Sequence, residues 1–291
     1  MSNPVRRVAV VAIAGDNKLY AFRASTSAWV VQSATGLVST DKVVALGDVA
    51  VIAVAGDNKL YGFSSSTGAW AVQSASGLVA EDKVVAGGNM AVVAVAGDNK
   101  LYAFRASTGT WVTQSATGLV NTDKVVAAAS VAVVAVAGDN KLYGFSSSTG
   151  AWAVQSAPGL VDTDKVTVGA NLAVVAVAGD NKLYAFRAST GTWIVQSATG
   201  LVTEDKVAAG DSVAAVAVAG DNKLYGFSVS TGTWAAQSAN GLVVEDKVVV
   251  GDSVAVVAVA GDNKLYGFRA STGTWTVQSA SGLVATDIVM A

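Results

Sequence analysis

The sequence contains no histidine and no cysteine, and only two prolines. Without cysteine there is neither a disulfide framework nor a thiolate nucleophile, and the redox compartment stays open. Without histidine the chain lacks the commonest general base, and the two absences together remove the commonest zinc ligands. We therefore expect no metal site and no cofactor.

Charge and long apolar runs are also scarce. The net charge is −2, so no overall field attracts nucleic acid or an anionic membrane. No apolar stretch approaches the roughly 18 residues that a membrane helix needs. Arg6 and Arg7, followed by the apolar run 8–14, imitate a short signal peptide. Because the same run recurs six more times, we interpret it as a strand and expect a cytoplasmic protein, with secretion left open.

What the sequence does contain is one unit repeated seven times. Tryptophan, tyrosine and the tetrapeptide Gly-Asp-Asn-Lys each recur every 41 residues, without an insertion or a deletion. The tryptophans are Trp29, Trp70, Trp111, Trp152, Trp193, Trp234 and Trp275. Such regular self-similarity is typical of repeat architectures. We expect residues 1–291 to form a single domain.

Each repeat predicts four strands. In residues 82–122, four pieces rich in β-branched or aromatic residues lie at 82–86, 90–96, 100–105 and 110–115, separated by turn residues. We name these strands A to D. Three of the joins are short and suit tight hairpins, in which the Asp-Asn pair supplies positive φ. The join from D to the next A has about seven or eight residues, which suits a crossing between neighbouring sheets.

Strand B predicts how these sheets pack. In residues 49–55 both faces of the strand are apolar, which fits a sheet covered on both sides by neighbouring sheets. The sequence therefore predicts an all-β, seven-bladed β-propeller with four antiparallel strands per blade. The chain starts at a strand B and finishes with a strand A at 287–290, so we expect that strand to complete the N-terminal blade and close the ring. An open solenoid is the competing arrangement, and it normally carries polar caps.

The succession of a Val/Ala strand, Gly-Asp-Asn, Lys-Leu-Tyr-Ala-Phe, Ser-Thr-Gly and Trp resembles tectonin-type propeller repeats. It is also similar to quinoprotein-type and kelch blades. The tectonin resemblance implies several equivalent carbohydrate sites, because that group includes lectins. The cofactor-binding residues of quinoprotein dehydrogenases find no match here, and the Gly-Gly pair of kelch blades is replaced by Ala55-Gly56 and its equivalents.

Two repeated sets are candidate ligand-binding residues. The first set begins strand A and is expected to ring the mouth of a central channel: Asp41, Asp82, Asp123, Asp164, Asp205, Asp246 and Asp287. Lysine follows the aspartate in six of these seven positions. Two alternatives therefore stay open: the aspartate and lysine charges neutralise each other, or the ring of aspartates binds a cation or a small polar ligand. The second set ends strand C in the odd repeats, where the even repeats carry serine: Arg23, Arg105, Arg187 and Arg269. These arginines are either solvated or contact an anionic or sugar ligand.

The tryptophans and the repeated Gln-Ser pairs are further candidates, because an indole can stack on a sugar and an amide can bind its hydroxyls. Catalysis needs an asymmetric arrangement of acid, base and nucleophile, whereas every group here recurs in equivalent surroundings. We therefore expect no enzyme and no catalytic residue. The leading hypothesis is a monomeric, multivalent, lectin-like binding module for glycans or a protein partner. The alternative is a structural or interaction scaffold, or an engineered propeller, without a small-molecule ligand.

Overall fold

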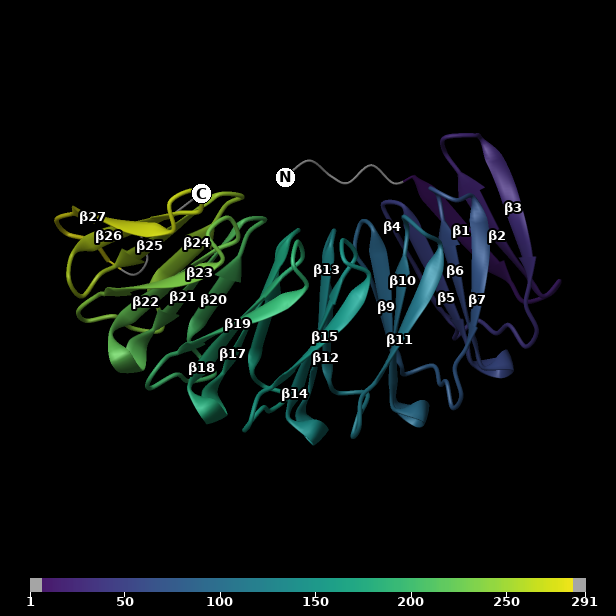
Figure 1. The fold of residues 1–291 in the computed structure, drawn as a ribbon, viewed down its shortest axis with the longest axis horizontal. Helices are drawn as coiled ribbons and strands as arrows, with labels where there is room; N and C mark the ends of the chain where they lie inside the picture. The colour runs from purple at the N-terminus through teal and green to yellow at the C-terminus, as the bar shows by residue number, and fades with distance from the viewer. Residues whose placement is uncertain (1–6, 285–291) are drawn as a thin grey trace. The chain divides into compact units, whose positions relative to one another are not determined.

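The computed structural model describes residues 7–284, and it is built from seven antiparallel sheets (Figure 1). The first sheet has three strands in the described residues: β1 (Val8–Ile13), β2 (Lys18–Arg23) and β3 (Ala28–Ser33). The second has the order β4 (Lys42–Leu46), β5 (Val49–Val54), β6 (Lys59–Ser64), β7 (Ala69–Ser74). The third has the order β8 (Lys83–Ala86), β9 (Met90–Val95), β10 (Lys100–Arg105), β11 (Thr110–Ser115).

The remaining four sheets repeat this meander. The fourth has β12 (Lys124–Ala127), β13 (Val131–Val136), β14 (Lys141–Ser146) and β15 (Ala151–Ser156). The fifth has β16 (Lys165–Val168), β17 (Leu172–Val177), β18 (Lys182–Arg187) and β19 (Thr192–Ser197). The sixth and seventh have β20 (Lys206–Ala209), β21 (Val213–Val218), β22 (Lys223–Ser228), β23 (Thr233–Ser238), β24 (Lys247–Val250), β25 (Val254–Val259), β26 (Lys264–Arg269) and β27 (Thr274–Ser279).

These seven meanders are the blades of a seven-bladed β-propeller, so the predicted fold class is confirmed. Strands C and D of the third repeat have the predicted bounds. The third strand A begins at Lys83 rather than Asp82, because the Asp82 side chain binds backbone amides before the ladder starts. Six sheets have all four strands. The predicted closing strand at 287–290 lies outside the described residues, so ring closure stays a prediction.

The join between strands B and C differs from the predicted two-residue hairpin. In five repeats it is a one-turn 3-10 helix: η1 (Ala55–Asp57), η2 (Ala96–Asp98), η3 (Ala137–Asp139), η4 (Ala178–Asp180) and η5 (Ala219–Asp221). The following asparagine has positive φ, for example 54° at Asn58. Asparagine tolerates this left-handed conformation better than most residues do. The expected positive φ is thus confirmed for the asparagine, whereas the aspartate is part of the helical turn.

The chain divides into two compact units, residues 1–139 with 145–152, and residues 140–144 with 153–291. The boundary falls within the fourth repeat, and the expectation of a single domain stays a prediction. Within each unit, neighbouring sheets pack face to face. In the first unit, for instance, Val51 of β5 belongs to one buried cluster with Val93 and Tyr102 of the third sheet. Strand B is buried on both faces in the second to sixth sheets, as predicted.

A glycine of strand C shows how close this packing is. A Cβ atom added to Gly62 would lie 2.6 Å from the ring of Phe104 in the next sheet. The same contact joins Gly144 to Phe186, and Gly226 to Phe268. Glycine is therefore required wherever a phenylalanine ring of the following sheet approaches the backbone this closely.

Candidate functional site

The aspartates that precede strand A accept hydrogen bonds from backbone amides of the protein. Asp82 is 1% exposed, and its Oδ2 accepts the Val79 amide at 2.8 Å while its Oδ1 accepts the Ala96 amide at 3.1 Å. The carboxylate thus ties the incoming connection to the end of the neighbouring strand B. The same pair of bonds is made by Asp41, Asp123, Asp164, Asp205 and Asp246.

Burial has an electrostatic consequence at these sites. It raises the pKa of Asp82 and of Asp205, although the two backbone amides that each carboxylate accepts act in the opposite direction. The nearby carboxylates of Asp98 and Glu81 raise the pKa of Asp82 further. A buried carboxylate that already accepts two amides offers little to an external ligand. Ligand contact by this set therefore stays a prediction that its burial disfavours, and Asp287 lies outside the described residues.

The lysine after each of these aspartates does not share its environment. Lys83 is exposed, whereas Asp82 beside it is buried. The mutual neutralisation expected from the sequence is therefore not what orients Asp82, since its oxygens are held by amides. Lysine is instead paired in the Gly-Asp-Asn-Lys turns, where Lys59 lies 3.6 Å from Asp57 Oδ2.

The Gly-Asp-Asn-Lys turn organises the connection between repeats. Tyr61 donates its hydroxyl hydrogen to Asp57 Oδ2 at 2.5 Å, and burial followed by this hydrogen bond raises the pKa of Tyr61 above its ordinary value. Asn58 Oδ1 accepts the amide of Leu78 in the loop that leaves the same repeat. Gly56 lies against Gly36 of the preceding loop, where an added Cβ would be 2.3 Å from the Gly36 oxygen. The Gly-Asp-Asn-Lys residues thus stabilise the turn itself and the loops beside it.

The arginines at the end of strand C bind the next repeat. Arg23 donates from Nε to the Ser65 carbonyl at 2.6 Å. Arg105 donates to the Ser147 carbonyl from Nε at 3.2 Å and from a terminal nitrogen at 2.9 Å. Arg187 donates to the Val229 carbonyl at 2.6 Å. These three side chains are half-buried rather than solvated, so their main contacts are made within the protein.

The even repeats make the equivalent contact with serine. Ser64 is fully buried and donates its hydroxyl hydrogen to the Ala106 carbonyl at 2.5 Å, and Ser228 does the same to the Ala270 carbonyl. The Arg/Ser alternation seen in the sequence is therefore an alternation of two sheet-to-sheet contacts. Arg269 differs from the other three arginines. It is exposed, and within residues 7–284 its guanidinium makes no hydrogen bond.

The outermost strands of neighbouring sheets are joined by a tryptophan, and each of these strands also carries a glutamine. Trp111 of β11 donates its indole hydrogen to the Ala71 carbonyl of β7 at 3.1 Å. Ala71 and Gln73 share one face of β7, because residues two apart on a strand point the same way. Gln73 is thus on the face of β7 that carries Ala71, whose carbonyl accepts the half-buried Trp111, and the exposed Ser115 is on the face of β11 that carries Trp111. We call this set a rim junction.

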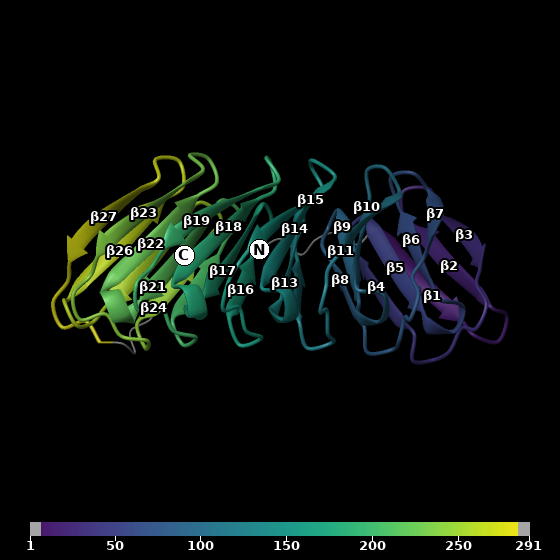
Figure 2. The same cartoon turned by 60° about the horizontal axis from the view of Figure 1, so that its bottom comes forward.

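Six rim junctions occur among the described residues, one for each pair of consecutive repeats. The tryptophan in each donates to a carbonyl 40 residues earlier: Trp70 to Val30, Trp111 to Ala71, Trp152 to Val112, Trp193 to Ala153, Trp234 to Ile194 and Trp275 to Ala235. In the second unit, the outer strands β23 and β27 of two neighbouring sheets lie side by side (Figure 2). Each Trp ring also packs on a phenylalanine, at 5.1 Å between centroids for Phe104 and Trp111.

The rim junction was not predicted as a unit. Tryptophan and glutamine were each named from the sequence as sugar-binding candidates, but they come from different repeats and opposite sheet faces. The two residues could have been connected from the sequence by combining two features: the alternation of side chains between the two faces of a strand, and the order of the sheets along the chain. By contrast, the Asp set lies just before strand A and the Arg set at the end of strand C, so neither set is on the outer strand of the rim junction.

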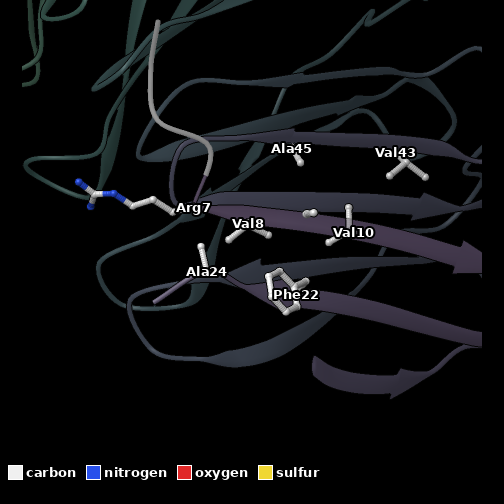
Figure 3. Close-up of a pocket in the computed structure, with 8 residues that line it drawn as sticks. Arg7, Val8, Val10, Phe22, Ala24, Val43 and Ala45 are labelled. Atoms are coloured by element: carbon white, nitrogen blue, oxygen red, sulfur yellow. The ribbon is translucent and has the colours of Figure 1, made fainter. Parts of the chain in front are cut away.

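No histidine, cysteine, aspartate or glutamate side chains gather in threes to hold a metal anywhere in residues 7–284. Two cavities lie against the first sheet. One of about 540 Å³ is lined by Val8, Val10, Phe22 and Ala24 with Val43 and Ala45 of β4 (Figure 3). The other, of about 460 Å³, is lined by Val11, Ile13, Tyr20, Trp29 and Val31. Within the described part of the chain, no helix is long and apolar enough to cross a membrane.

No protein-family model matches the sequence, and no curated protein matches it. Solved structures resemble the chain only distantly. Hsv2 of Kluyveromyces lactis is 10% identical with a TM-score of 0.36, and the alignment covers 95% of each chain. Apo AztD of Citrobacter koseri is 12% identical with a TM-score of 0.38, covering 95% of this chain and 86% of that one. The dihydro-heme d1 dehydrogenase NirN is 11% identical with a TM-score of 0.34, and the alignment covers 92% of this chain and 63% of NirN. Likenesses this distant carry no argument about function.

Proposed function

We propose that the protein is a non-enzymatic, multivalent binding module whose ligand is a carbohydrate bound at the rim junctions. The observation that carries the proposal is the repetition of one surface. A partly exposed indole, a glutamine amide and a serine hydroxyl recur together six times in the described residues. An aromatic ring beside hydrogen-bonding groups is the chemistry that recognises a sugar, which has apolar C–H faces and hydroxyl edges.

The glutamine has capacity left for a ligand. Gln73 donates one amide hydrogen to the Ser74 carbonyl at 3.0 Å, which holds the side chain along β7. An amide group carries two donors and an acceptor, so the second hydrogen and the oxygen are open to sugar hydroxyls. The same bond recurs in all seven repeats, so each glutamine is held in one orientation.

Multivalency compensates for a shallow site. A single rim junction presents a small contact area, and it should bind one sugar unit weakly. Several such junctions on one chain raise the effective affinity for a ligand that displays many copies of the sugar, without any new contact. The targets that fit are therefore branched or surface-displayed glycans.

A glycan array followed by calorimetry tests the proposal. Labelled protein should bind a defined class of glycan, and titration with the free sugar should give several equivalent sites per chain. Gln73→Ala should remove about one of these sites, because it deletes the amide from one rim junction. Ser66→Ala is the matched control, since it removes an exposed hydroxyl of the same repeat away from the outer strand. A silent array at high protein concentration, or a single site per chain, would contradict the proposal.

The second candidate function is a scaffold without a small-molecule ligand. It is favoured by the finding that the repeated Asp, Asn and Arg side chains bind backbone groups of the protein, and that the repeated glycines pack closely against neighbouring residues. If the protein is such a scaffold, the Gln73→Ala variant should change no ligand binding. The protein should then bind a protein partner in place of a sugar.

A further inference from the structure

Strand D is the outer edge of every sheet. Within residues 7–284 it stands at the end of the strand order in all seven sheets and pairs with strand C alone. β7, for example, pairs with β6 along its whole length and with no strand on its other side. An edge strand presents main-chain N–H and C=O groups that can pair with a further strand. The outer edges are therefore places where an extended chain can bind.

The alternation of hydrogen bonds shows which main-chain groups of β7 point outward. Directly after β7, the Ala75 amide donates to the Asn58 carbonyl at 2.8 Å. In an antiparallel pair, residues that bond to the partner strand alternate with residues that do not. Counting back from Ala75, the residues that do not bond to β6 are Ser74, Val72 and Trp70. Their N–H and C=O groups therefore point toward the open side of β7.

The glutamine of strand D covers only the end of this outer edge. Gln73 donates to the Ser74 carbonyl at 3.0 Å, so one outward carbonyl already has a partner. The N–H and C=O groups of Val72, at the middle of the edge, make no such contact with a side chain in the described part of the chain. Val72 is also 46% exposed. The centre of the edge is therefore open both at the main chain and at the side chain.

Strand D lacks the features that usually keep two sheet edges apart. Charged side chains, prolines and bulges on an edge strand all discourage the addition of another strand. None of the seven strands D contains a charged residue or a proline. The register of β7 on β6 also runs without a bulge. Tryptophan, valine, isoleucine and threonine are frequent in these strands, and all four favour an extended backbone.

A second copy of strand D complements this edge. In an antiparallel pairing with twofold symmetry about Val72, that residue lies opposite its own copy, and Trp70 lies opposite Ser74. These three residues are the ones whose main-chain groups point outward, so the open groups of one edge meet those of the other. Like charges placed opposite each other would destabilise such a pair, but neither strand carries a charge. The contact is self-complementary, as a twofold interface requires.

We propose that strand D of one copy of the chain pairs in antiparallel fashion with strand D of a second copy, so that the protein associates with itself. Each chain carries seven outer edges, so a pairing at one edge leaves others open and association does not end at a dimer. Self-association takes the place of the monomer expected from the sequence. The pairing is made by main-chain groups and does not depend on glycan binding.

Lysine at the centre of every outer edge tests the proposal. The edge variant changes seven exposed residues of strand D: Val31→Lys, Val72→Lys, Thr113→Lys, Val154→Lys, Val195→Lys, Ala236→Lys and Val277→Lys. The matched loop variant changes seven exposed valines of the D-to-A connections: Val38→Lys, Val79→Lys, Val120→Lys, Val161→Lys, Val202→Lys, Val243→Lys and Val284→Lys. Both variants gain the same charge, and circular dichroism establishes that both are folded. Their mass in solution is then measured by analytical ultracentrifugation over a range of protein concentrations.

We expect the average mass of the unmodified protein and of the loop variant to rise with concentration, while the edge variant keeps the mass of one chain. Unmodified protein that stays monomeric at every concentration would overturn the proposal. An edge variant that associates as strongly as the loop variant would overturn it as well, because the contact would then lie elsewhere. The measurement is made without sugar, so its outcome is independent of the glycan array.

Hydrogen exchange of the unmodified protein gives a second test that needs no variant. The outward amide of Val72 should exchange quickly in a single chain and slowly once a second strand supplies an acceptor. Its exchange should therefore slow as the protein concentration rises. The Ala75 amide, which is bonded to Asn58 within the same repeat, should exchange at the same rate throughout. A Val72 rate that does not change with concentration would contradict the proposal.

Discussion

Replacing Asp82 by alanine should be among the most destabilising single changes in the chain. The substitution removes the only side chain that accepts the Val79 and Ala96 amides, at 2.8 and 3.1 Å, in a site where the carboxylate is 1% exposed. Each buried donor left without a partner costs about 1–3 kcal/mol, so the two together should lower the free energy of unfolding by about 2–6 kcal/mol.

Two further variants separate the hydrogen bonds from the charge. Asp82→Asn keeps one acceptor oxygen, so it should lose roughly half as much stability as the alanine variant. Lys83→Ala removes the exposed neighbouring charge and should change stability by no more than about 0.5 kcal/mol. Urea denaturation of the three variants and the unmodified protein gives these free energies. If Asp82→Ala behaves like Lys83→Ala, the carboxylate does not hold the connection and the reasoning is refuted.

The tyrosines and arginines that make contacts within and between repeats should also affect stability. Burial and the hydrogen bond to an aspartate raise the pKa of five tyrosines: Tyr61, Tyr102, Tyr184, Tyr225 and Tyr266. Their contribution to stability is therefore full below the pKa of tyrosine in the unfolded chain, about 10, and is lost as the pH rises beyond it. Tyrosinate absorbance and circular dichroism should therefore change together on alkaline titration, and tyrosine ionisation in a folded protein would contradict this. Arg105→Ala should cost about 1.5–3 kcal/mol through the lost bonds to Ser147, whereas Arg7→Ala, at an exposed ion pair, should cost less than about 1 kcal/mol. Equal losses in urea denaturation would count against the account of the arginines.

The strands were predictable from the sequence because each depends on local signals. Strand C of the third repeat has the bounds expected from its Lys-Leu-Tyr pattern and the flanking turns. Strand B could be assigned to a buried position because both of its faces are apolar, and it is fully buried in five sheets. The length of the D-to-A join correctly separated connections between sheets from turns within them.

The roles of the polar residues were not predictable, because they depend on contacts between repeats. Asp82 and Lys83 look like a neutral pair in the sequence, yet one is buried against amides and the other is exposed. Arg105 was expected to be solvated or to contact a ligand, but it reaches a carbonyl 42 residues further along. The rim junction needs Trp111 and Gln73 from different repeats, and identical repeats give no signal that singles out such a pair.

A crystal structure of the protein soaked with mixed monosaccharides would show directly where a sugar binds. We expect sugar density against the tryptophan of several rim junctions, with the glutamine of the preceding repeat bonded to the sugar hydroxyls. We also expect the carboxylates of Asp82 and its equivalents to keep their two backbone amides. Sugar bound at those aspartates or at Arg105, with the rim junctions empty, would contradict it.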